Sequence, residues 1–357
     1  MRAPLVTLPR LGGRPSARNP IEVSHARTLT VTWWREQPGA PSPGGLEPAG
    51  TLAVVSASLS DDGARPVQRQ MTVELAAVPV ELQVGMWIQS TLGIKLLAPD
   101  MYRLPNLMIT AIDRKLDRQG GATLHAEDPA TVLNGRPYEA DTTLTGTLRT
   151  LVKAACDLSL RRETNVDAVP DIALPGESLA EFGSGRWDTC LKMADALGVQ
   201  LRFTDDGDVK GFLRSAPAPA PAATVTQVIV PPGGTHHSTR TPTSAVVLVT
   251  RGGTVAPLTG RAAASAVPAH YLSYVVVDRK EGDPMTTQAQ ADALAAAFLT
   301  TRLSDFDRYT DMSILPAPWL EAGEDTVEFD GAPYWVRAIQ FELPALTTSI
   351  TLRSVTT

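Results

Sequence analysis

Hydrophobic and polar residues alternate along much of the first third of the chain. The clearest stretch is residues 67–75, in which almost every second residue is apolar, as in a strand with one buried face. Only Arg69 interrupts that face, so we expect its end of the strand to lie at a rim. Further strands are expected at 28–34, 51–58, 86–92, 107–114 and 122–127. Short strands at this spacing predict an antiparallel sandwich or small barrel.

The middle of the chain changes to a helical period. Residues 145–158 and 186–197 each place apolar side chains on one stripe, and Gly198 follows the second stripe where a helix-ending glycine belongs. Alternation then returns at 199–213 and is interrupted by a tight turn at Asp206-Gly207. Helix, helix and hairpin predict a small α+β unit.

A Pro/Ala-rich stretch separates this unit from the last third of the chain. Residues 215–223 read SAPAPAPAA, which predicts an extended, semi-rigid linker. One helix is expected at 287–304, where Thr287 and Gln290 form a capping-box pair. The other expected elements are strands at 245–250, 271–278, 308–314, 326–329, 333–342 and 347–353.

The predicted fold is therefore mainly β with an α+β insert. We expect the following parts: an extended N-terminal arm (1–24), a first β-domain (25–135), the α+β insert (136–214), a linker (215–243) and a second β-domain (244–357).

Composition narrows the function classes. The net charge is −6 without a basic stripe, which argues against nucleic-acid binding through phosphates and is compatible with a channel that DNA passes without sticking. Cys156 and Cys190 are expected to be two small buried residues, because two cysteines form no disulfide framework and none has metal-ligand spacing. No signal peptide or membrane span is apparent, so we expect the chain to be made and folded in a cytoplasm.

The candidate chemistry is weak. His236-His237 is expected in a solvated loop, and Asp205–Asp208 lacks the EF-hand spacing because its glycine comes third. The sequence contains no G-x-S-x-G elbow, H-E-x-x-H helix or P-loop. A pair of carboxylates distant in sequence stays open as a glycosidase site. We predict that the chain is not an enzyme and that it binds no metal and no cofactor.

Three tryptophans are candidates for packing and contact. Adjacent residues of a strand point to opposite faces, so one ring of Trp33-Trp34 is expected to point away from its own core. Trp33 and Trp34 are therefore the candidate subunit contact. Trp187 is expected to anchor the second helix of the insert on its hairpin.

Two segments carry a resemblance to a known family. Residues 186–203, followed by Asp205-Asp206-Gly207, and residues 320–339 resemble the baseplate hub and minor tail proteins of long-tailed bacteriophages, especially those infecting actinobacteria. In that family a Trp opens a helix, the helix ends on a Gly, and a hairpin turns on Asp-Gly. The matching positions are Trp187, Gly198 and Gly207, with Gly323, Gly331 and Trp335 in the closing hairpin.

The resemblance implies a trimeric hub at the virion tail tip, made and assembled in the host cytoplasm. Each subunit would supply two β-barrel-like tube domains, so that three subunits present a pseudo-sixfold ring to the tail tube and threefold symmetry to the tip. The implied partners are the distal tail or tail tube ring above, and a fibre, spike or other baseplate protein below. Phage DNA would pass through without specific binding.

Two other functions compete with the hub. The β-rich flanks and the outward-facing tryptophan favour a tail protein that binds host-surface carbohydrate. A tail-associated cell-wall hydrolase is the third hypothesis.

Overall fold

The computed structural model describes most of the first two thirds of the chain and parts of the last third. The described residues are 26–36, 46–63, 65–95, 99–115, 121–160, 163–174, 178–213, 218–225, 228–229, 236–239, 243–249, 258–263, 273–279, 287–289, 291–293, 295–296, 307–314, 317–343 and 347–355.

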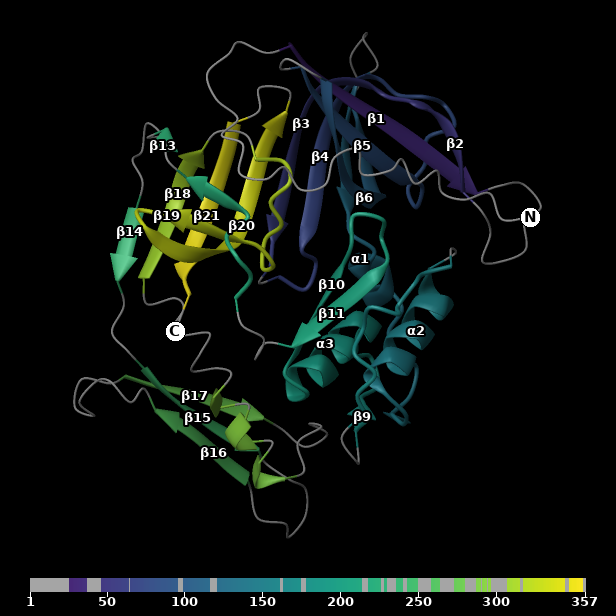
Figure 1. Cartoon of the computed structure of the whole chain (residues 1–357). Helices are drawn as coiled ribbons and strands as arrows, with labels where there is room; N and C mark the ends of the chain where they lie inside the picture. Colours follow the sequence, from purple (N-terminus) through teal and green to yellow (C-terminus); the bar gives the residue numbers. More distant parts are fainter. Residues whose placement is uncertain are drawn as a thin grey trace.

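One 14-stranded, largely antiparallel sheet is the main feature of the fold (Figure 1). Its strands from the first third are β1 (Ala26–Glu36), β2 (Leu46–Thr51), β3 (Ala53–Asp62), β4 (Arg69–Ala77), β5 (Trp87–Lys95), β6 (Pro99–Arg114) and β7 (Ala122–Glu127). Its strands from the last third are β12 (Ala223–Val225), β13 (Val228–Ile229), β14 (His236–Thr239), β18 (Asp307–Ile314), β19 (Thr326–Phe329), β20 (Ala332–Leu343) and β21 (Thr347–Ser354).

The two flanking β-regions are joined directly. β20 pairs with β3 along six positions, with Phe341 opposite Leu59, so the yellow and blue strands of Figure 1 form one continuous sheet. Its main path runs from β13 to β2, and its two ends do not pair with each other among the described residues. The mainly β prediction is confirmed, whereas the closed, barrel-like form is not seen in this part of the chain.

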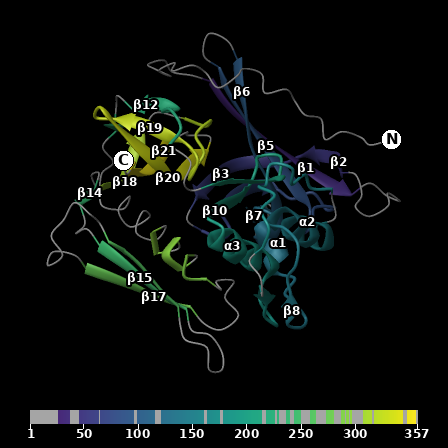
Figure 2. The same ribbon diagram turned by 60° about the horizontal axis from the view of Figure 1, so that its bottom comes forward.

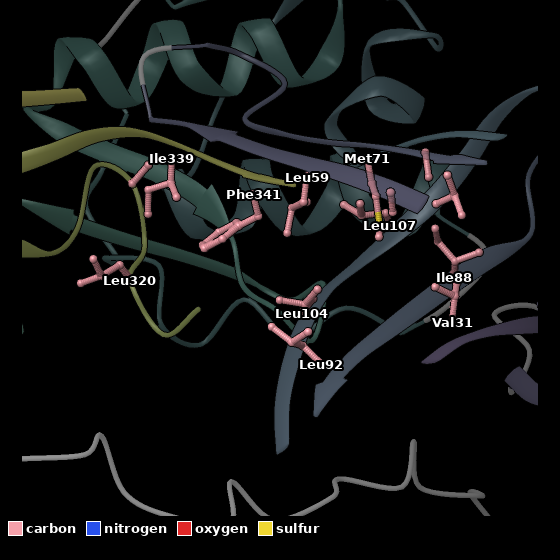
Figure 3. Close-up of a cluster of buried hydrophobic side chains, with 14 of the residues drawn as sticks. Val31, Leu59, Met71, Ile88, Leu92, Leu104, Leu107, Leu320, Ile339 and Phe341 are labelled. Atoms are coloured by element: carbon pink, nitrogen blue, oxygen red, sulfur yellow. The ribbon is translucent and has the colours of Figure 1, made fainter. Parts of the chain in front are cut away.

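Apolar residues at every second position of the strands form the core of the sheet. On β4, Met71, Val73 and Leu75 are buried while the residues between them are half-buried, as the period of two requires. The matching face of β3 buries Ala57 and Leu59 opposite β4. Figure 3 shows Leu59, Met71 and Phe341 with other apolar side chains of this cluster, which we call the sheet core. It contains residues from both flanking regions.

The insert has a core of its own. It comprises α1 (Ala130–Asn134), β8 (Thr142–Thr143), α2 (Leu148–Ser159), β9 (Leu179–Ala180), α3 (Arg186–Ala196), β10 (Val199–Phe203) and β11 (Val209–Leu213), grouped below the blue strands in Figure 1. Its buried apolar residues form a separate cluster, the insert core, that shares no member with the sheet core. The two helices and the hairpin lie where the sequence predicts them. Figure 2 shows the same helices from another side, beside β7 and β10.

Several elements differ from the sequence prediction. β2 lies mostly between the strands predicted at 28–34 and 51–58, where no strand was expected. It contains Pro48, which is tolerated because β2 is an edge strand of the sheet. β12, β13 and β14 form within the expected linker, so His236-His237 belongs to a strand rather than to a loop. The unpredicted short helix α1 has too few residues for a periodic signal.

A smaller sheet and a helical segment complete the description. β15 (Thr243–Val249) lies between β16 (Leu258–Ala263), which the sequence did not predict, and β17 (Ser273–Arg279). Residues 288–289, 291–293 and 295–296 are helical, within the predicted helix, and Ala291 and Ala295 are buried as its apolar stripe requires. Gln290 of the expected capping box and the N-terminal arm lie outside the described residues.

Candidate functional site

The most unusual feature of the molecule is a cluster of charged side chains buried where the insert meets the sheet. Asp61 is the last buried residue of β3, and Arg69 is the first buried residue of β4. The two residues lie opposite each other where these strands pair. Both side chains are buried, and the Arg69 side chain is 2% exposed. The expectation that Arg69 lies at a rim is therefore wrong.

One oxygen of Asp61 joins three parts of the chain. Its Oδ2 accepts a hydrogen bond from Nε of Arg69 at 3.4 Å and one from Nη2 of Arg202, on β10 of the insert, at 3.2 Å. The backbone N–H of Ala322, in the loop before β19, donates to the same oxygen at 3.2 Å. Asp61 thus connects the sheet, the insert and the C-terminal region through a single acceptor.

The two arginines make further contacts across the same boundary. Arg69 Nη1 lies 2.9 Å from Oδ1 of Asp205 and donates to the carbonyl oxygen of Phe203 at 3.3 Å. Arg202 Nη1 donates to the carbonyl oxygen of Ala322 at 2.6 Å. Because a buried guanidinium is costly without partners, these contacts are what allow both arginines to be buried.

A pair of glutamates closes the cluster on the C-terminal side. Lys210 Nζ, on β11, lies 3.1 Å from Glu321 Oε2, and Arg202 Nη1 lies 3.6 Å from Glu324 Oε2. Burial alone would raise the pKa of Glu321, but a hydrogen bond from Glu324 and the neighbouring cations outweigh it and lower the pKa. The pKa of Glu324 is raised by burial and by the adjacent Glu321. The pKa values of the two neighbouring carboxyl groups therefore shift in opposite directions.

Asp128 fixes the point where the chain enters the insert. Its Oδ2 accepts the backbone N–H groups of Gln68 and Arg69, and its Oδ1 accepts that of Ala130 at the start of α1. Burial raises the pKa of Asp128 to about 6 although these hydrogen bonds lower it. The carboxyl group holds the first turn of the insert against the beginning of β4.

Two glycines allow the loops around the cluster to approach closely. A Cβ atom on Gly63, just after β3, would lie 2.8 Å from the Cα of Gly323. Gly323 itself has φ +77° and donates its N–H to the carbonyl oxygen of Val336 at 2.6 Å. Only residues without a side chain fit at this contact, which brings Ala322 within reach of Asp61.

Some of the residues singled out from the sequence lie in or next to the charged cluster. Trp187 borders the cluster: its ring is buried against Phe203 at 4.8 Å between centroids, and its indole N–H donates to the carbonyl oxygen of Pro66 at 3.1 Å. Gly207 turns the β10–β11 hairpin next to Asp205, and Gly323 lies in the loop described above. Gly198, Gly207, Gly323 and Gly331 all have positive φ.

The other predicted residues lie away from the cluster. Gly331 turns the β19–β20 hairpin, and Trp335 is half-buried on β20 opposite Thr326. Trp33 belongs to the sheet core and is 2% exposed, whereas Trp34, on the other face of β1, is half-buried. The subunit contact stays a prediction, and of the two rings only Trp34 is outside the chain's own core.

The charged residues of the cluster were not found from the sequence. Arg69 gave the one visible signal, because it is a charged residue in the apolar phase of a strand. Its partners come from positions as distant as Asp205 and Glu321, and no local pattern relates these residues. Among the described residues no group of three or more His, Cys, Asp or Glu side chains is placed to hold a metal ion. The carboxylates of the cluster instead face arginine and lysine, an arrangement that holds segments together.

Comparison with known proteins shows the class of fold. No protein-family model and no curated protein sequence matches the chain. Solved structures do match it over 91–92% of the chain, and they include prophage tail proteins and a component of a type VI secretion system.

Three of these structures are tail proteins of similar size. The 43 kDa tail protein of prophage MuSo2 from Shewanella oneidensis is 11% identical with a TM-score of 0.57, and the alignment covers 91% of this chain and 98% of that one. A tail protein from Neisseria meningitidis is 12% identical with a TM-score of 0.56, covering 92% and 96%. Prophage tail protein gp18 from Listeria monocytogenes is 12% identical with a TM-score of 0.55, covering 92% and 94%. The chain therefore has the fold of these tail proteins.

A fourth similar structure comes from a secretion system. It is an Escherichia coli component of the type VI secretion system, described as structurally similar to the T4 bacteriophage tail proteins gp27 and gp5. The identity is 9%, the TM-score is 0.53, and the alignment covers 92% of this chain and 77% of that one.

In the part of the chain that the structure describes, no helix is both long enough and apolar enough to cross a membrane.

Proposed function

We propose that the chain is a structural subunit of a bacteriophage tail tip, a baseplate hub that assembles as a homotrimer. The observation that carries this proposal is the shared fold with three tail proteins, which extends over almost the full length of both partners in each comparison. The similarity of the Escherichia coli protein to gp27 and gp5 further favours a place at the tip rather than along the tube.

In this proposal each subunit contributes two β-regions to a ring. Three subunits present a pseudo-sixfold surface to the distal tail or tail tube protein and a threefold surface to a fibre, spike or other baseplate protein. The ring lines the channel through which phage DNA passes without specific binding, in keeping with the net charge of −6. Assembly takes place in the host cytoplasm.

Two measurements test the proposal. Native mass spectrometry of the purified chain should give a trimer, and averaged electron-microscopic images of tails carrying a tagged chain should place the tag at the tip with threefold symmetry. A stable monomer that is missing from purified virions contradicts the hub.

The role we propose requires no catalysis. In the buried cluster, Asp61 and Glu321 are engaged by Arg69, Arg202 and Lys210, which supports a structural use of these carboxylates. Zymography with host cell walls should show no clearing. A cleared band that tracks with the chain would identify a hydrolase instead.

A further inference from the structure

We propose that the insert is a separately folded module, held on the sheet by an ionic latch and able to undock as an intact unit. The latch comprises Asp61, Arg69, Arg202, Asp205 and Glu321. This inference goes beyond the proposed function and does not depend on it.

The first observation is that the two cores are separate. The insert core includes Leu148, Val152 and Trp187, whereas the sheet core contains residues of both flanking β-regions and none of the insert. From the sheet side, only Val67 and Met108 among the described residues pack, partly buried, against the insert core. An interface with so few shared apolar residues can separate without opening either core.

The second observation is that the contacts crossing the boundary are mainly polar. Besides the latch, the backbone N–H of Asn106 donates to the carbonyl oxygen of Asp205 at 2.9 Å, and Arg103 Nη1 lies 2.6 Å from Asp206 Oδ1. Gln68 Nε2 donates to the carbonyl oxygen of Leu201 at 3.4 Å. Directional contacts of this kind fix one docked orientation, but they gain much less on closing than an apolar interface of similar size, because each charged group loses its water on docking.

The third observation concerns Asp61. Arg69, Arg202 and the Ala322 N–H all donate to its Oδ2, so three segments depend on one carboxylate. Asp128 forms a separate anchor at the chain's entry to the insert, through hydrogen bonds to Gln68 and Arg69. The geometry therefore combines a backbone anchor at the entry to the insert with side-chain contacts that can be released, as in a hinged module.

Native-state hydrogen exchange at low urea concentrations tests the proposal directly. The reporting amide crosses the boundary: the N–H of Asn106, on β6, donates to the carbonyl oxygen of Asp205 in the insert, and we call it the boundary amide. The reference amide is that of Leu160, whose N–H donates to Cys156 inside the insert. We expect the boundary amide to exchange through an opening with a smaller urea dependence than that of Leu160, because undocking exposes less surface than unfolding.

The substitution Asp61→Asn should accelerate boundary exchange by roughly 100-fold or more, since it leaves two buried arginines without their shared carboxylate. Exchange at Leu160 should change much less. The matched control Asp62→Asn alters the neighbouring carboxylate, which pairs with the exposed Arg65 outside the latch, and should leave exchange of the boundary amide unchanged.

A second variant keeps the test decisive if Asp61→Asn folds poorly. Replacing the paired groups of the latch by apolar residues, Asp61→Leu and Asp205→Leu with Arg69→Met and Arg202→Met, should slow boundary exchange to the rate of Leu160, since apolar groups of similar volume often dock more tightly than buried ion pairs. Glu321 keeps Lys210 as its partner in this variant. The proposal is overturned if the boundary amide and that of Leu160 in the wild-type chain exchange together, with one urea dependence. That result would show that the insert and the sheet open only as one unit.

Discussion

Gly63 and Gly323 meet backbone to backbone, so closely that a Cβ atom on Gly63 would lie 2.8 Å from the Cα of Gly323. The contact joins the loop after β3 to the loop before β19, residues that are far apart in the chain. It sets the distance at which Asp61 receives the Ala322 N–H, so the glycine pair and the latch form one structural unit.

Replacing Gly63 by alanine should therefore destabilise the fold by about 1–3 kcal/mol, because backbone atoms on both sides cannot move apart without strain. Chemical denaturation monitored by circular dichroism measures this change. Gly135→Ala is the matched control, since its Cβ would meet no atom closer than 3.4 Å, and we expect a shift within roughly 0.5 kcal/mol. Equal effects of the two substitutions would argue against a steric role for Gly63.

The parts of the fold that sequence predicts well are those with local signals. The sequence correctly places α3 of the insert, the Gly198 that follows it and the hairpin at Gly207. Helical periodicity and turn residues are the local signals that fix these positions. By contrast, nothing local indicates that β20 pairs with β3, because that ladder joins positions such as Phe341 and Leu59. Two β-domains were predicted where the structure has one continuous sheet.

The same limit applies to the candidate site. Arg69 stood out as an irregularity in an alternating strand, but its burial depends on acids from β3, from the insert and from the C-terminal loop. A charged residue on an apolar face is ambiguous until those partners are known, because a solvated rim and a buried ion pair give the same sequence pattern.

Asp128 should give the stability of the protein a distinctive pH dependence. Burial raises its pKa in the folded state to about 6 from 3.8, so the folded chain binds this proton more tightly than the unfolded chain does. The contribution of Asp128 to the free energy of unfolding therefore increases as the pH falls from 7 to 5, by roughly 1 kcal/mol.

The substitution Asp128→Asn removes this term, because the amide does not titrate. Urea denaturation of both proteins between pH 7 and 5 should show the wild-type chain gaining stability relative to the variant as the pH is lowered. Two curves that stay parallel through this range would mean that Asp128 titrates near its ordinary pKa.

The two thiols should be unreactive in the native protein. Cys156 and Cys190 are fully buried in the insert core, and burial, with Cys156 nearby, raises the pKa of Cys190 and so suppresses the thiolate. A thiol-specific reagent should label neither residue in native buffer and both in concentrated denaturant. Because the insert keeps its core when it undocks, Asp61→Asn should not expose these thiols, whereas a variant that unfolds the insert should.

The adjacent tryptophans of β1 should behave differently when each is replaced by alanine. Trp33 lies in the sheet core, so Trp33→Ala should cost about 3–5 kcal/mol of folding free energy through the lost burial and the cavity left behind. Trp34 is half-buried on the opposite face, and its replacement should cost less in stability.

If Trp34 makes the subunit contact, Trp34→Ala should instead weaken the trimer at a given concentration, which sedimentation velocity measures. A variant that stays trimeric but no longer binds host envelopes would assign the ring to carbohydrate recognition, and a variant that changes neither property would remove Trp34 from both roles.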